Sequence, residues 1–134
     1  MSKAPCQIPF VDQPVILIER DGDPKAGWTF DGWFLRPLFD RGDSLVFDGV
    51  ELIDFHPLAN RRWRFDGRDL WLQPGPEVLW RLEAGVLSKP GVLVVASWQF
   101  DGSTLEQVSD IRPDRWRADA EVPVLVMAFV AGLL

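Results

Sequence analysis

Apolar and polar residues alternate along most of this chain, in short runs separated by turn residues. Between residues 28 and 35, for example, large apolar side chains take every second place before an Asp-Gly pair and again after it. A period of two is typical of β-strands with one buried face, whereas no segment has the 3.6-residue period of an amphipathic helix. The pattern therefore predicts an all-β chain of short strands.

The pattern is also repetitive, because a cassette of the form W-x-F-D-G-x-x-L recurs every 17 or 18 residues. Its first position is held by Trp28, Leu45, Trp63, Trp80, Trp98 and Trp116. Self-similarity of fixed period indicates one structural unit used repeatedly. The three best-matching cassettes begin at residues 28, 63 and 98, which are 35 residues apart. Six hairpin repeats, arranged as three pairs, are the expected organisation.

Each cassette is expected to form a β-hairpin. Asp-Gly between apolar residues favours a two-residue type I′ turn, because both central positions of that turn need a positive φ. Such a turn in the first cassette puts Phe30 opposite Trp33 and Trp28 opposite Leu35, with all four facing the core. The fourth cassette lacks the Asp-Gly pair and predicts a slightly longer turn, with Gly85 in the left-handed region.

Second turns rich in Pro and Gly lie between the cassettes, for example at 40–43 and 89–91. Together with an N-terminal strand at 15–19, they give about twelve short antiparallel strands. A pseudo-threefold closed barrel, such as a β-trefoil-like fold, would hold these strands without exposed edges. The alternative is a β-solenoid in which the Asp-Gly pairs form corners.

The C-terminal segment 122–134 is almost continuously apolar. It is shorter than the roughly 20 residues that a membrane-spanning helix needs. We expect a buried terminal element, and its period leaves open whether it is a strand or a short helix. The whole chain, 1–134, is predicted to be one domain with an N-terminal arm at 1–14.

A barrel wrapped around an apolar C-terminus resembles the tubby-like and LURP-one-related roll, in which short strand pairs precede a hydrophobic terminal helix. The resemblance rests on this layout and on the run 122–134. It implies a tubby-like roll as the form of the closed barrel, and it assigns no functional residue.

Composition narrows the classes of function. The chain of 134 residues has seven Trp and nine Phe and a formal net charge of −6. An acidic chain is not expected to bind nucleic acid. The single cysteine, Cys6, allows no internal disulfide and no CxxC metal site. The first ten residues lack the apolar run of a signal peptide, so we expect a cytoplasmic protein or an intracellularly assembled particle.

No catalytic motif stands out. The repeated aspartates, Asp31, Asp48, Asp66 and Asp101, are explained by turn chemistry and do not have the spacing of a calcium loop. His56, the single histidine, lies in a predicted turn without a nucleophile motif near it. There is no phosphate-binding loop or dinucleotide fingerprint. We therefore predict no enzyme, no cofactor and no metal.

Four residues are candidate contacts for a ligand or partner. In the hairpin register, Trp71 and Phe34 face outward, and exposed apolar patches usually mark partner surfaces. Arg62 and Arg64 belong to the one basic spot of the chain, which also contains Arg61 and Arg68. The predicted hairpin register puts Arg64 opposite Asp69, so cross-strand pairing with carboxylates explains that spot most simply, and a small anion site is the alternative.

These features predict a non-catalytic binding or structural assembly module that recognises a protein or glycan partner. A subunit of a virion or secretion-type assembly, including a homo-oligomer, is one concrete form. The alternative is a barrel that binds a small sugar or lipid ligand, and an uncharacterised hydrolase is the third class.

Overall fold

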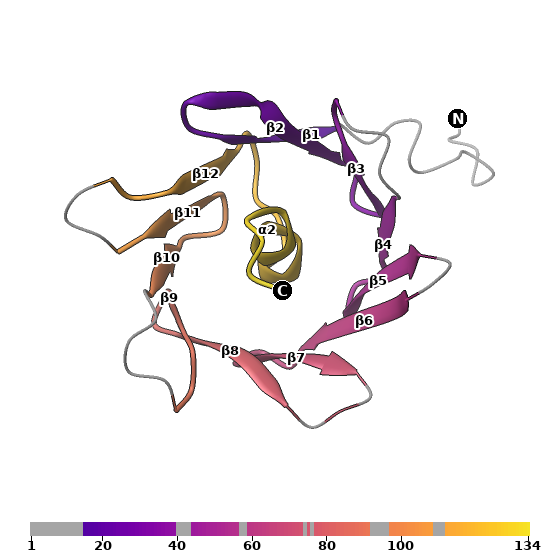
Figure 1. The fold of residues 1–134 in the computed structure, drawn as a ribbon, viewed down its shortest axis with the longest axis vertical. Coiled ribbons are helices and arrows are strands. Elements are labelled where there is room, and N and C mark those ends of the chain that lie inside the picture. The colour runs from indigo at the N-terminus through magenta and orange to yellow at the C-terminus, as the bar shows by residue number, and fades with distance from the viewer. Residues whose placement is uncertain are drawn as a thin grey trace, which may run out of the picture.

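Twelve β-strands form one closed antiparallel barrel around a short helix (Figure 1). The structure is a computed structural model that describes residues 15–39, 44–56, 59–73, 75, 77–91, 97–108 and 112–134. The elements are β1 (Ile16–Arg20), β2 (Asp23–Phe30), β3 (Phe34–Pro37), β4 (Leu45–Phe47), β5 (Glu51–His56), β6 (Ala59–Phe65), β7 (Asp69–Gln73), β8 (Val78–Glu83), β9 (Val86–Ser88), β10 (Trp98–Phe100), β11 (Thr104–Gln107), β12 (Arg115–Ala118) and the helix α2 (Val124–Val130). The predicted all-β closed barrel is confirmed. The N-terminal arm 1–14 and the predicted turn at 40–43 lie outside the described residues.

Every strand pairs with its neighbours in the sequence, and β1 pairs with β12 to close the ring. The closing register sets Ile18 opposite Ala118 and Arg20 opposite Trp116. Closure leaves no unpaired sheet edge. Of the arrangements that the sequence allows, a roll around the C-terminal segment describes this ring best, and the Asp-Gly pairs are hairpin turns rather than solenoid corners.

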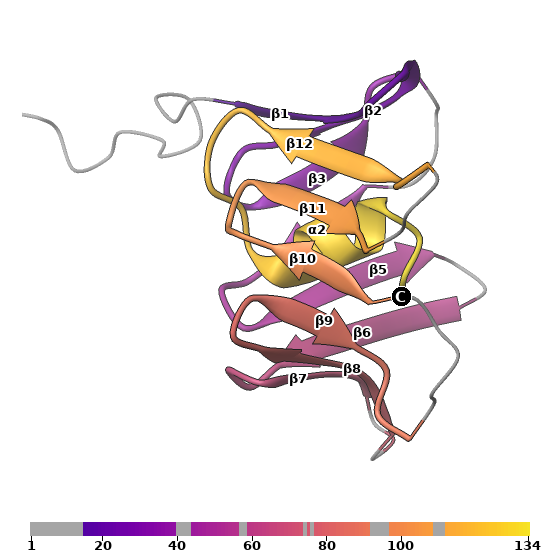
Figure 2. The ribbon, with the colours of Figure 1, turned by 90° about the vertical axis from the view of Figure 1, so that its left-hand side faces the viewer.

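The two ends of the barrel differ (Figure 2). The turns within the cassettes lie together at one end, which we call the cassette end, and the chain enters α2 from there. The β1–β2 turn and the C-terminus lie at the opposite end. The cassette end therefore repeats one turn motif around the ring.

The cassette turn has a different geometry from the one predicted. In the first hairpin Phe30 pairs with Leu35, so the predicted register is wrong by two residues. Gly32 alone takes the positive φ, at 95°, and it is the first of the two central residues, Gly32 and Trp33, between Asp31 and Phe34. The Asp31 carboxylate accepts hydrogen bonds from the backbone N–H groups of Trp33 (2.9 Å) and Phe34 (2.7 Å). The aspartate thus holds the turn with its side chain and has no need of a left-handed backbone.

This register links neighbouring cassettes through the core. The Leu of one cassette pairs with the first residue of the next, as in Leu35–Leu45, Leu52–Trp63, Leu70–Trp80, Leu87–Trp98 and Leu105–Trp116. The cassette Leu of each pair is fully buried: Leu35, Leu52, Leu70, Leu87 and Leu105. The repeated apolar residues are therefore core residues that join one hairpin to the next.

The fourth turn is shorter than predicted. Glu83 pairs with Val86, which leaves Ala84 and Gly85 as a two-residue turn. Both have positive φ, 52° and 79°, as a type I′ turn requires. The expected left-handed Gly85 is confirmed, while the expected extra length is wrong because Ala84 also adopts a left-handed backbone.

The apolar C-terminal segment forms a helix in the centre of the barrel. All residues of α2 are buried except Phe129, which is half-buried between Trp28 (ring centroids 5.7 Å apart) and Trp63 (5.4 Å). The interior of a closed barrel has no free strand edge with which the segment could pair. A helix satisfies the hydrogen bonds of the segment's backbone N–H and C=O groups within the segment itself. Such a helix can be apolar on every side because it is buried on every side. Within the described residues, no helix is both long and apolar enough to cross a membrane.

Candidate functional site on the outer barrel face

A row of mainly apolar side chains crosses the outside of four neighbouring strands. Phe34 pairs with Val46, Val46 with Ile53, and Ile53 with Arg62. Directly opposed residues share a face of the sheet. Their sequence neighbours, such as Leu35 and the other core residues, point inward, so this row lies outside.

A second row lies beside the first. Arg64 pairs with Glu51 on one side and with Trp71 on the other. Arg62 and Arg64 are two residues apart on β6 and therefore share the outer face. We call Phe34, Val46, Ile53, Arg62, Arg64 and Trp71 the outer face, and it brings together all four residues singled out from the sequence.

The chemistry of the outer face changes along its length. The Arg36 guanidinium lies 4.8 Å from the centre of the half-buried Phe34 ring. In the middle, Ile53 is only 7% exposed although it points outward. At the far side Arg62 forms an ion pair with Glu51 (3.3 Å), whereas Arg64 has no ion-pair partner among the described residues. The outer face therefore has an aromatic end, an aliphatic middle and a cationic end.

Two tryptophans lie differently from what the sequence predicts. Trp71 faces outward as expected but is half-buried, and its indole N–H is shielded from solvent without a hydrogen-bond acceptor among the described residues. Trp33, expected in the core beside Phe30, is 46% exposed because it occupies a central position of the turn.

Val46 and Ile53 were not predicted as candidate contacts. Both alternate with inward-facing leucines, and extending the hairpin register along the chain would have placed them on the outside.

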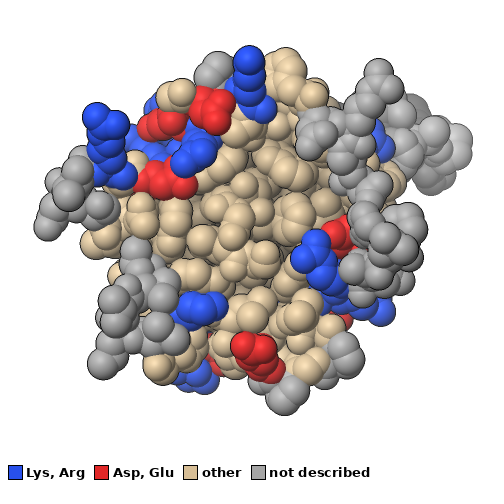
Figure 3. Space-filling model, in the orientation of Figure 1, with Lys and Arg blue, Asp and Glu red and all other residues tan. Residues whose placement is uncertain are grey.

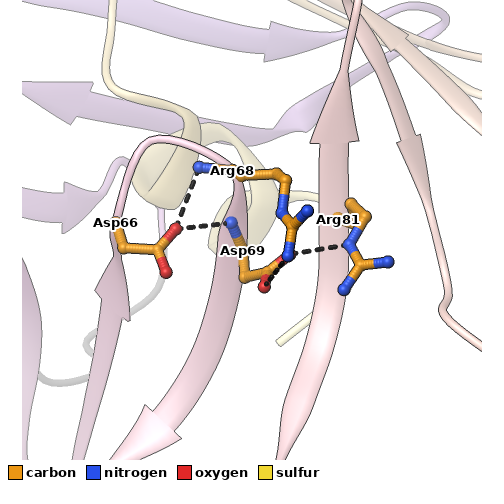
Figure 4. Close-up of polar contacts among 4 residues, drawn as sticks. All are labelled: Asp66, Arg68, Asp69 and Arg81. Atoms are coloured by element: carbon orange, nitrogen blue, oxygen red, sulfur yellow. Dashed lines mark hydrogen bonds and ion pairs between the residues drawn. The ribbon is translucent and has the colours of Figure 1, made fainter.

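The basic spot is used in part to hold the fold (Figure 4). Arg81 binds the nearly buried Asp69 at 2.9 Å, and Arg68 lies 3.4 Å from the same carboxylate. The Arg81 hydrogen bond holds the pKa of Asp69 below its ordinary value. Asp66 accepts hydrogen bonds from the backbone N–H groups of Arg68 and Asp69 (2.9 and 2.8 Å). Carboxylate pairing thus explains Arg68, but the predicted pairing of Asp69 with Arg64 is wrong because Arg64 lies opposite Trp71.

Charged side chains also gather where the barrel closes, over β12 and the β1–β2 hairpin (Figure 3). Arg117 binds Asp21 at 2.9 Å and Arg20 binds Asp114 at 2.8 Å. A hollow of about 430 Å³ lies here, lined mostly by charged side chains. Because these ion pairs join β12 and its flanking residues to the β1–β2 hairpin, we assign them to barrel closure.

Within the part of the chain that the structure describes, no group of three or more His, Cys, Asp or Glu side chains could hold a metal ion. His56, expected in a turn, is the last residue of β5 and pairs through its backbone with Ala59. Cys6 lies outside the described residues.

Comparison with known proteins adds no family to this geometry: no protein-family model, curated protein or solved structure matches the chain.

Proposed function

We propose that this protein is a non-catalytic binding module that contacts a protein partner through its outer face. The observation that carries the proposal is the outer row from Phe34 through Val46 and Ile53 to Arg62. The inward-facing residues form the core. The fold therefore does not require the outward-facing residues to be apolar. Phe34, Val46 and Ile53 follow one another across three strands on the outside of the barrel, and apolar patches on an outer surface usually mark partner surfaces.

The residue types support the same proposal. Protein interfaces are enriched in aromatic residues and Arg, and the few residues that dominate binding are often Trp, Tyr or Arg. The outer face has Trp71 and Arg64 side by side, with Glu51 next to them as a polar neighbour. An apolar centre bordered by polar residues is the usual anatomy of such a surface.

A protein fits the outer face better than a glycan. Sugar rings stack on open aromatic faces, whereas Trp71 is half-buried and the Phe34 ring already carries Arg36 at 4.8 Å. A glycan array probed with wild type and with Trp71→Ala tests the glycan version. Binding by wild type that the variant loses would favour glycan over protein as the partner.

Site-specific photo-cross-linking tests the proposal directly. The photo-reactive amino acid p-benzoyl-L-phenylalanine is placed at Val46, in the middle of the outer face, in cells that produce the protein. The matched control is Gln99, an exposed residue on β10 across the ring (Figure 1). We expect discrete cross-links to a protein from position 46 and none to that protein from position 99. No cross-link at 46, or the same products from both positions, contradicts the proposal.

A further inference from the structure

An apolar hollow of about 340 Å³ opens at the cassette end of the barrel. Its walls include Phe47, Val50, Phe65 and the first two residues of α2, Val124 and Leu125. Gly49 lies at its edge, where an added Cβ would meet no atom within 4 Å. The hollow is therefore open to solvent and lined largely by hydrocarbon.

The repeat itself shows that the apolar residues at this end are not required by the fold. The residue after Asp-Gly is Trp33, Val50, Arg68 or Ser103 in the four cassettes with this pair. The same turn thus accepts a charged or a small polar side chain. Trp33 and Val50 are nonetheless 46% and 51% exposed. The Trp33 carbonyl accepts a hydrogen bond from the N–H of Phe47 (2.8 Å), which places the two exposed turns next to each other at the hollow.

The charge of the cassette end indicates which kind of partner it would bind. Its six turn segments, 31–33, 48–50, 66–68, 84–85, 101–103 and 119–123, contain six acidic residues and one basic residue, Arg68, which is paired with Asp69. Asp48 and Asp66 adjoin the hollow residues Gly49 and Phe65 in the sequence, and backbone hydrogen bonds lower the pKa of both. Two copies docked through this end would bring like charges together, which is unfavourable. A positively charged partner is complementary.

We propose that the cassette end is a second docking site, which binds a basic segment of a partner protein by taking one of its aliphatic or aromatic side chains into the hollow. Acidic residues around the hollow attract the basic side chains that flank the inserted one. Because the hollow is open to solvent and both Val50 and the neighbouring Trp33 are exposed, it suits an extended peptide better than an enclosed small molecule. This site is separate from the outer face, and the two proposals are independent of each other.

A random peptide library displayed on phage, selected against the full chain, is the test. We expect enriched peptides with Lys or Arg next to Leu, Ile, Phe or Trp. Their affinity, measured by fluorescence polarisation, should fall at least tenfold with Val50→Arg and less with Val50→Ser. Both variants copy side chains that the chain already has at this turn position, in Arg68 and Ser103, so thermal unfolding should be unchanged.

The control variant is Arg64→Glu, which alters the outer face and should leave the affinity unchanged. Failure to enrich any peptide, enrichment of acidic peptides, or equal binding to wild type and Val50→Arg overturns the inference. Peptides whose binding responds to Arg64→Glu and not to Val50→Arg would also overturn it, while supporting the outer face as a binding surface.

Discussion

At the scale of single residues, the Asp of each Asp-Gly pair fixes the geometry of the cassette turn. The dipeptide fits two turns. In a type I′ turn Asp and Gly are the two central residues, whereas in a type II′ turn Gly is the first central residue, so the turn lies one residue further along the chain. The choice was made by the Asp carboxylate, which accepts backbone hydrogen bonds from the two residues that follow the Gly, as at Asp101 with Ser103 (3.0 Å) and Thr104 (2.8 Å). A sequence pattern of apolar positions contains no information about that side-chain acceptor.

These hydrogen bonds predict a loss of stability in acid. They lower the pKa values of Asp48, Asp66 and Asp101 in the folded protein. Their contribution is fully present above the unfolded value of about 3.9 and is lost as pH falls through the lower folded values. In urea unfolding, the difference in free energy between pH 7 and pH 3 should be smaller for Asp101→Asn than for wild type. The same difference in both proteins would contradict this.

Ala84 predicts a gain in stability. It is held at φ 52°, a region in which residues with a Cβ are strained and Asn is better tolerated. Ala84→Asn should raise the free energy of unfolding by about 1 kcal/mol, measured by urea denaturation. Ala84→Val, which is β-branched, should lower it. If the Asn variant is less stable than wild type, the turn is not type I′ in solution.

At the scale of elements, the strands were predictable and the helix was not. An alternating pattern with turn residues defines a strand, whereas the run 122–134 is apolar at nearly every position and fits a strand or a helix equally well. The decision depends on the closed ring, which has no free edge inside for a thirteenth strand. The places of Val46 and Ile53 on the outer face were not predicted either, because neither is one of the recurring residues of the cassette.

Helix α2 should be a large contributor to stability. Met127 is fully buried in the centre of the barrel. Met127→Ala leaves a cavity there and should lower the free energy of unfolding by about 2–5 kcal/mol. The comparison variant is Val108→Ala, which shortens a side chain that is 52% exposed and should change it by less than about 0.5 kcal/mol. Equal effects in thermal or urea unfolding would mean that the helix does not fill the barrel.

At the scale of the molecule, the repeat explains why the candidate residues meet. Each cassette advances the chain by two strands around the ring, so Phe34 on β3 and Arg62 on β6 are joined by the outward residues of β4 and β5. The sequence predicted the outward residues one hairpin at a time. Their convergence on one face required the order of all strands and the corrected register, which only the closed structure supplies.

We infer that inward residues make the fold and that the outer face is available to a partner. The most direct measurement is the free energy of urea unfolding for two neighbours on β6, each changed to the same residue, Trp63→Leu and Arg64→Leu. Trp63 is 1% exposed and lies against Phe129, and Leu45 shows that the first cassette position accepts Leu. We predict a loss of about 2–4 kcal/mol for Trp63→Leu and a change within about 0.5 kcal/mol for Arg64→Leu. Similar losses for both variants would contradict the claim, because the outer face would then be part of the scaffold.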